Sequence, residues 1–319
     1  MAFSIDQVST NDLEALVAFV EPFQHEARHR YDGLLHPGED ALRTSFQKRL
    51  EQGSGAVARQ NGKIIACLLG IGPFDDFRPG HRGVYAPLCS CLTSGPDQDR
   101  VFTSMLTEYG NIGAFAGVQI AAITAFPHHQ GLNASLVQNG FGVRCADSVV
   151  RITDLPTEVP DTDFTIEEVS IEDAVSLHEV KHMLATHLAS SPVYQELFDF
   201  SPAFITWKSE QRQSVHFAAR DGDRVVGFIE ATFEGENYLT RHPKMRNICG
   251  AGVLPEYRNR GIMLSLLVAL ASHYRPQGVT VLGVDYETQN PEARGFWERY
   301  FTPYTWSWER HYDREWGVL

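Results

Sequence analysis

The sequence has few cysteines, no long apolar run and no surplus of positive charge. Its five cysteines are odd in number and scattered, and none forms a C-x-x-C pair, so we expect reduced, mostly buried thiols. No stretch of about 18 apolar residues occurs, and the first residues lack the basic and apolar segments of a secretory leader. These absences predict a cytoplasmic protein that does not contact a membrane.

The charge balance argues against one large class of partner. The formal net charge is −13 at pH 7, whereas affinity for nucleic acid depends on clustered lysine and arginine that neutralise phosphates. We therefore expect no nucleic-acid partner. An acidic protein suits a cationic substrate, although many cytosolic proteins are acidic without that reason. The length of 319 residues and the hydrophobic content of 43% allow two packed domains. We expect a monomer or a homodimer.

The two halves of the chain repeat each other. Residues 56–69 read A-V-A-R-Q-N-G-K-I-I-A-C-L-L, and residues 217–230 read F-A-A-R-D-G-D-R-V-V-G-F-I-E. Both predict a β-hairpin, because two apolar strands flank an Asn-Gly or Asp-Gly turn. Arg59 aligns with Arg220, and this pairing fixes the offset between the two copies.

Other features recur in the same order around this hairpin. Each half opens with a strand-like piece and a helix-start pattern, and each closes on a helix that is followed by a last strand. Residues 153–163 are rich in proline and acid and predict a linker. The sequence therefore predicts two copies of one α/β unit, an N-terminal domain over residues 1–152 and a C-terminal domain over residues 164–319.

The strongest chemical pattern is C-G-A-G-V-L-P-E-Y-R-N-R-G-I-M-L-S-L-L, at residues 249–267. It predicts a strand that ends near Val253, a turn, and an apolar helix that begins around Gly261. A helix that starts after a basic, glycine-containing turn presents backbone N–H groups and the positive end of its dipole to an anion such as pyrophosphate. Arg258 and Arg260 would add positive charge there. A solvated, charged helix cap is the alternative.

Two motifs resemble the GNAT acetyltransferase superfamily. V-L-P-E-Y-R-N-R-G-I-M is similar to the acetyl-coenzyme A signature V-x-P-x-x-R-x-x-G-x-[GA] of that family. N-P-E-A-R-G-F-W-E-R-Y-F, which begins at Asn290, is similar to N-x-x-A-x-x-F-[YW] on its last helix. The chain also resembles a bacterial tandem-GNAT subfamily. The resemblance implies an α/β fold of two tandem GNAT-like domains, each a central mixed, mostly antiparallel sheet flanked by helices.

The resemblance also implies acetyl-coenzyme A as co-substrate, without a metal. The backbone of Val253 would align the pantetheine arm, and Asn290 would contact the coenzyme. Gly250 and Gly252 suit a bulge that separates the fourth strand from the fifth. The pyrophosphate would lie on the backbone amides of one run of residues: Arg258, Asn259, Arg260, Gly261, Ile262 and Met263.

The implied reaction transfers an acetyl group to a primary amine of a small-molecule or peptide acceptor. Glu230 and Asp285 are the candidate bases that deprotonate the amine. Trp297 stands where many family members have the tyrosine that protonates the departing thiolate, and Met263 stands where they have Gly or Ala. These departures leave the general acid open, with Tyr300 as the candidate. The aromatic run at residues 194–207 predicts either an acceptor cleft or a core helix.

The first copy lacks the coenzyme-binding pattern. Asp97 and Asp99 stand where Arg258 and Arg260 stand in the second copy, and carboxylates at that turn would repel pyrophosphate. We expect a degenerate N-terminal domain that binds no coenzyme. The Pro-His-His stretch at residues 127–129 predicts a surface loop, with a catalytic or metal-binding role as the alternative.

Two alternative functions stay open. One is a coenzyme A-binding sensor without catalysis, which the Trp297 departure favours. The other is a zinc hydrolase, because H-E-V-K-H at residues 178–182 matches H-E-x-x-H, a pattern that places two imidazoles on one helix face beside a glutamate. No further motif supplies a third ligand, so an ordinary scaffold helix competes with the zinc site.

Overall fold

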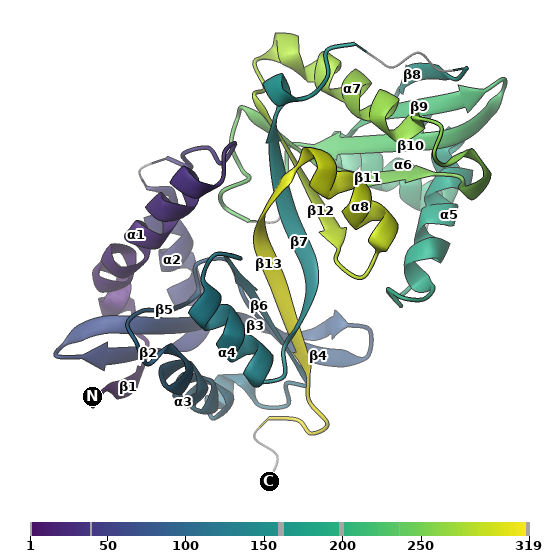
Figure 1. Ribbon diagram of the computed structural model, residues 1–319. Helices are drawn as coiled ribbons and strands as arrows, with labels where there is room; N and C mark the ends of the chain where they lie inside the picture. Colours follow the sequence, from purple (N-terminus) through teal and green to yellow (C-terminus); the bar gives the residue numbers. More distant parts are fainter. Residues whose placement is uncertain (1, 39, 159–162, 198–200, 236, 317–319) are drawn as a thin grey trace. The chain divides into compact units, whose positions relative to one another are not determined.

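The computed structural model describes residues 2–38, 40–158, 163–197, 201–235 and 237–316 (Figure 1). The first of two units takes the described residues within Met1–Tyr31, His36–Ala146 and Pro303–Leu319, and the second takes those within Asp32–Leu35 and Asp147–Thr302. The C-terminal segment thus belongs to the first unit, whereas the predicted boundaries, 1–152 and 164–319, assign it to the second. Residues 159–162 of the predicted linker lie outside the described residues.

The first unit contains a mixed sheet in the order β1-β2-β3-β4-β6-β13, with the short β5 beside β3. Only β4 and β6 are parallel among these pairs. Its elements are β1 (Ser4–Gln7), α1 (Leu13–Arg30), α2 (Ala41–Gln52), β2 (Gly53–Gln60), β3 (Lys63–Arg78), β4 (His81–Ala86), β5 (Cys91–Thr93), α3 (Gln98–Gly110), β6 (Ile120–Ala125), α4 (Gln130–Gln138) and β13 (Thr302–His311). The unit boundary falls within β7 (Gly142–Arg151).

The second unit contains a sheet in the order β8-β9-β10-β11-β12, in which β11 and β12 are parallel and the other three neighbouring pairs are antiparallel. Its elements are β8 (Thr165–Val169), α5 (His178–Ala189), α6 (Pro202–Arg212), β9 (Val215–Asp221), β10 (Arg224–Thr232), β11 (Met245–Val253), α7 (Ile262–Tyr274), β12 (Val281–Glu287) and α8 (Pro291–Tyr300). Both units are therefore mixed, mostly antiparallel sheets flanked by helices, and the predicted fold class is confirmed.

The predicted repeat is also present in the structure. When Arg59 is aligned with Arg220, β2, β6 and α4 coincide closely in sequence with β9, β12 and α8. Strand β3 begins at the residue equivalent to the start of β10 but runs further along the chain. One difference lies at the fourth strand, which is continuous as β11 in the second unit but is divided into β4 and β5 in the first. Another is that α3 begins slightly earlier than α7 in this alignment.

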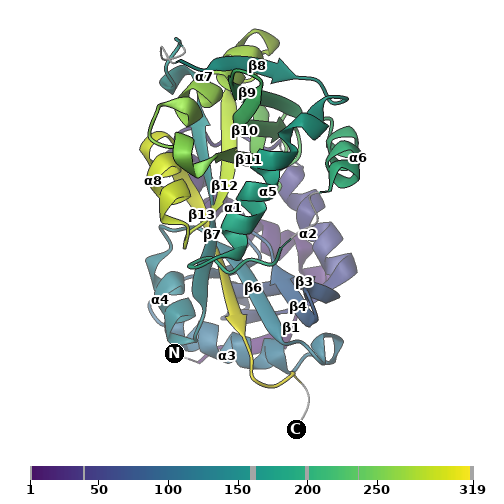
Figure 2. The same ribbon diagram turned by 90° about the vertical axis from the view of Figure 1, so that its right-hand side faces the viewer.

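Two helices of the second unit pack on opposite faces of β10. Gly227 faces α7, because a Cβ there would lie 3.0 Å from the Ile262 Cγ2 atom. The next residue, Phe228, points to the other face, where its ring lies 5.5 Å from the Lys181 Nζ atom of α5. Figure 2 shows α5 running along β10 and β11. The sheet thus holds the start of α7 on one side and α5 on the other.

Burial of apolar side chains fixes α7 on the sheet. Leu266, Leu267 and Leu270 are fully buried in it, and each such leucine contributes about 1.5–3 kcal/mol relative to an exposed one. This helix is too short to span a bilayer, and within the described residues no helix is both long and apolar enough to do so.

Candidate active site

Strand β11 separates from β12 halfway along its length. The two strands pair in parallel from Met245 opposite Val281 to Ile248 opposite Val284. On its other side β11 pairs with β10, but Gly250 lies opposite Glu230 while Ile248 lies opposite Ala231, so Cys249 is an extra residue. Such a bulge bends the strand and increases its twist. The predicted bulge is therefore present, and beyond it β11 leaves β12.

A cavity of about 250 Å³ lies at this separation. It is bounded by α5, α6, β10, β11, β12 and α8, all in the second unit. Four carboxylates and two ammonium groups are among the described side chains that line it: Glu196, Glu230, Asp285, Glu287, Lys181 and Lys208. The lining is therefore net negative, which suits a cationic ligand.

The turn between β11 and α7 has the backbone form that an anion site requires. Gly261 is the N-cap of α7 with φ 80°, a left-handed conformation that glycine adopts without steric cost. Ser265 donates its amide hydrogen to the Gly261 carbonyl at 3.0 Å, so the three amides of residues 262–264 precede the intrahelical pattern. These N–H groups stand at the positive end of the helix dipole.

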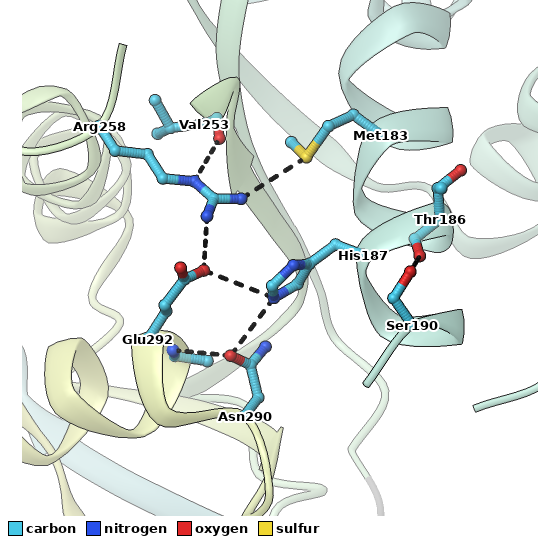
Figure 3. Close-up of polar contacts among 9 residues, drawn as sticks. Met183, Thr186, His187, Ser190, Val253, Arg258, Asn290 and Glu292 are labelled. Atoms are coloured by element: carbon cyan, nitrogen blue, oxygen red, sulfur yellow. Dashed lines mark hydrogen bonds and ion pairs between the residues drawn. The ribbon is translucent and has the colours of Figure 1, made fainter. Parts of the chain in front are cut away.

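The Arg258 side chain points toward Val253, Met183 and Glu292 (Figure 3). Its Nε atom donates to the Val253 carbonyl at 3.2 Å, and its Nη1 atom donates to Glu292 Oε2 at 2.6 Å. The Nε2 atom of His187 lies 3.5 Å from the same carboxylate and 3.4 Å from Asn290 Oδ1. Arg258 therefore ties the end of β11 to α8, and Glu292 balances its charge.

Other predicted coenzyme residues occupy defined places near this turn. Asn290 is 5% exposed and caps α8, because its side-chain oxygen accepts the Ala293 amide hydrogen at 3.3 Å. The guanidinium of Arg260 lies over the Tyr257 ring at 5.3 Å. Asn259 has a left-handed φ of 62°. The structure thus gathers the predicted run at the start of α7, while the Asn290 oxygen already has a partner in the helix.

Glu230 belongs to a buried network of charged side chains. Its Oε2 atom accepts a hydrogen bond from Lys181 Nζ at 2.5 Å, and its Oε1 atom lies 3.7 Å from His216 Nε2. Burial alone raises the pKa of the Glu230 carboxyl, but His216 and Lys181 together hold the pKa well below its usual value. Glu230 is consequently a stable anion and a weak proton acceptor.

The remaining catalytic candidates lie in different settings. Asp285 is exposed at the cavity, on β12 directly after Val284, the last residue that pairs with β11. Trp297 also lines the cavity and is 6% exposed. Tyr300 is not among the described lining residues, and its ring packs on Phe296 with centroids 5.3 Å apart. The structure therefore brings Glu230 and Asp285 to one cavity and leaves Tyr300 outside its lining.

The sequence interpretation missed Lys181, His216 and His187 as parts of this site. For Lys181 the sequence repeat does contain a usable pattern. The alignment of the two copies places Lys181 opposite Val20 and Glu230 opposite Leu69. Both of these apolar residues are buried in the first unit. A lysine and a glutamate that both replace buried apolar residues indicate a buried ion pair.

The H-E-V-K-H segment forms the first turns of α5. The rings of His178 and His182 are parallel, with centroids 6.1 Å apart, and Glu179 pairs with Arg224 at 2.6 Å. Among the described residues, no His, Cys, Asp or Glu comes together with these two rings as a third ligand. The segment therefore fits a scaffold helix better than a zinc centre.

Residues 181–301 match the model of the acetyltransferase (GNAT) family. This stretch runs from α5 to the end of α8 and includes the bulge, the α7 turn and the cavity. Residues 181–301 form a GNAT domain. The family resemblance of the two motifs is thereby confirmed. A comparison with curated proteins found no match.

Solved structures show that the GNAT likeness of the fold extends over the whole chain. One is a tandem GNAT protein from the clavulanic acid biosynthesis pathway, 15% identical, with 100% of both chains covered and a TM-score of 0.54. Another is a GCN5-related N-acetyltransferase from Sphaerobacter thermophilus, 15% identical, with 97% of this chain and 95% of that chain covered and a TM-score of 0.60. At these identities the likeness shows the fold alone.

Proposed function

We propose that the protein is an acetyl-coenzyme A-dependent N-acetyltransferase with its active site in the GNAT domain. The observation that supports this best is the separation of β11 from β12 directly before the turn at Gly261. A slot between strands, a glycine turn and the free amides of a helix start are together suited to a long ligand with a pyrophosphate. Acetyl-coenzyme A supplies the acetyl group from its thioester, and coenzyme A leaves as the free thiol.

We assign the coenzyme contacts to the residues named from the sequence. The amides at Arg258, Asn259, Arg260, Gly261, Ile262 and Met263 hold the pyrophosphate, and the Val253 backbone aligns the pantetheine arm. Asn290 contributes by fixing the start of α8 at the edge of the cavity. The first unit binds no coenzyme, since Asp97 is the N-cap of α3 and Asp99 lies in its first turn.

The acceptor is a primary amine on a small molecule or a peptide. A lysine-like amine has a pKa of about 10.4, so presenting it neutral at pH 7 costs about 4.6 kcal/mol. The net negative lining of the cavity favours binding of its ammonium form. Asp285 then accepts the proton from the bound amine, because Glu230 is already paired with Lys181.

The proton for the departing thiolate has no assigned donor in the cavity. Trp297 occupies the wall there, and an indole N–H does not act as an acid at neutral pH. Tyr300 stays the sequence prediction for this role. Tyr300→Phe tests it, because loss of a general acid lowers the turnover number by about 10²–10⁴-fold and leaves coenzyme affinity unchanged.

Thiol release in the presence of a panel of amines tests the proposed function. The panel holds polyamines, amino sugars, amino acids and lysine-containing peptides, and a thiol reagent detects free coenzyme A. Release that depends on one class of amine, together with an acetylated product seen by mass spectrometry, is the expected result. Trp297 favours a second candidate, a coenzyme A-binding sensor. A sensor binds acetyl-coenzyme A and releases no thiol with any amine, and this outcome would replace the enzyme assignment.

A further inference from the structure

The first unit contains a second cluster of metal-ligand side chains, apart from the H-E-V-K-H segment. Glu26 on α1 meets His128 and His129 in the turn between β6 and α4, and one ligand atom from each lies within 4.8 Å of the other two. The sequence predicts a surface loop here. Residues 127–129 do lie in a turn and are of intermediate exposure, but the His128 side chain itself is only 5% exposed.

Both imidazoles leave a buried nitrogen unused. Within the part of the chain that the structure describes, neither the His128 Nε2 atom nor the His129 Nε2 atom has a hydrogen-bond partner. The His128 Nε2 atom lies 3.9 Å from Glu26 Oε1, which is too long for a hydrogen bond. A buried polar atom without a partner costs roughly as much free energy as a lost hydrogen bond. The two Nε2 atoms would therefore be stabilised by a partner that binds both.

The other nitrogen of His128 is oriented as in a metal ligand. Its Nδ1 atom lies 2.9 Å from the Tyr31 hydroxyl oxygen, which can accept the ring N–H and so leave the Nε2 lone pair for a cation. Ligating histidines almost always have such an outer partner.

The surroundings complete a site of this kind. The rings of Phe23 and Phe126 pack edge-on against His129, with centroids 5.0 and 5.4 Å away, and form an apolar wall. Glu26 is half-exposed and its present partner is Arg30, at 3.3 Å on the next helical turn. Such an exposed pair contributes little to stability, so the carboxylate can turn to a cation at low cost.

From these contacts we propose that Glu26, His128 and His129 bind one divalent transition metal ion of the zinc class. Two imidazoles and a carboxylate are three protein ligands of the type that zinc takes, with a fourth position open to water. The equivalent positions of the second unit indicate what the metal ion does in the structure. The alignment of the two copies places Glu26 opposite His187 and His129 opposite Asn290, the two residues that join α5 to the start of α8 in the second unit. The metal ion joins α1 to the start of α4 in the same place.

Zinc titration tests the proposal. The full chain is first freed of metal with a chelator, and zinc binding is then measured by calorimetry. One zinc ion per chain is expected, with visible absorption bands of low-symmetry coordination when cobalt replaces zinc. Glu26→Gln should weaken zinc binding at least about 10-fold, and Tyr31→Phe by about 10–100-fold through loss of the outer partner. His128→Asn and His129→Asn should abolish it.

Two control variants locate the ion. The double variants His178→Asn/His182→Asn and His25→Asn/His29→Asn should keep wild-type zinc affinity, although each removes two histidines one helical turn apart. Because Glu26 is half-exposed, Glu26→Gln should keep the metal-free melting temperature, so its loss of affinity cannot come from unfolding. No zinc uptake, or uptake unchanged by Glu26→Gln and His128→Asn, or uptake lost in a control variant, overturns the proposal.

Discussion

At the scale of single residues, the buried pair Lys181 and Glu230 makes the clearest stability prediction. Glu230→Gln leaves a buried ammonium without its anion, and breaking a buried ion pair from one side costs about 3–5 kcal/mol. Urea denaturation should show this loss in the free energy of unfolding. Glu196→Gln, which changes an exposed carboxylate of the same cavity, should stay within about 0.5 kcal/mol of the wild type. A Glu230→Gln variant as stable as the control would contradict the network.

Acid should weaken the contribution of Glu230 in a defined direction. Its pKa in the folded protein is lowered, so the carboxylate stabilises the fold fully above its unfolded pKa of about 4.3 and progressively less as the pH falls below that value. The difference in unfolding free energy between wild type and Glu230→Gln should therefore be constant near neutral pH and shrink in acid. A difference that grows as the pH falls would contradict this assignment.

The proposed role of Asp285 as the catalytic base leads to a prediction for the reaction rate. If its carboxylate accepts the amine proton, Asp285→Asn should lower the turnover number by about 10²–10⁴-fold and leave the dissociation constant of acetyl-coenzyme A unchanged. The measurement is thiol release at saturating coenzyme, beside calorimetric binding. Glu287→Gln, two residues further along β12, should keep the rate within a few-fold. Wild-type turnover by Asp285→Asn would remove this residue from the mechanism.

At this scale, some features could be predicted from the sequence and others could not. Gly261 and Asn290 could be placed from local motifs, since a helix start and its cap depend on a few neighbouring residues. The partner of a charged side chain depends on the tertiary fold. Arg258 illustrates this: the sequence predicts that it adds charge at the anion site, whereas its guanidinium donates to Val253 and Glu292.

At the scale of elements, the bulge at Cys249 separates β11 from β12. Deleting Cys249 restores a regular register with β10 and removes the bend and the extra twist that the bulge gives to β11. Acetyl-coenzyme A binding should therefore be lost. Cys249→Ala keeps the extra residue and should keep the affinity. Calorimetry on the two variants checks this, and binding by the deletion variant would show that the bulge is not needed.

The order of the elements could be predicted because it follows from local patterns. Hairpins at Asn-Gly and Asp-Gly turns and amphipathic helices recur at one offset, and the structure has them there. The unit to which the last strand belongs could not be predicted. β7 and β13 are equivalent under the repeat, and a local pattern does not specify which neighbour a strand pairs with.

At the scale of the whole molecule, the first unit needs the end of the chain. β13 pairs with β6 from Trp306 opposite Ala125 to His311 opposite Ile120. A chain of residues 1–152 lacks β13 and leaves the edge of β6 open, so it should aggregate when expressed alone. Adding a peptide of residues 302–316 should recover soluble, protease-resistant protein. A stable, soluble chain of residues 1–152 without the peptide would contradict this assignment of β13.

The central claim is a single acetyl-coenzyme A site at the start of α7. Calorimetry with the wild type, Gly261→Glu and Gly278→Glu tests it directly, because both glycines have a left-handed φ, 80° and 77°, and lie beyond opposite ends of the same helix. Both substitutions carry the same backbone strain and charge. We predict one acetyl-coenzyme A per chain for the wild type and Gly278→Glu, and none for Gly261→Glu. Two sites per chain, or equal binding by both variants, would contradict the claim.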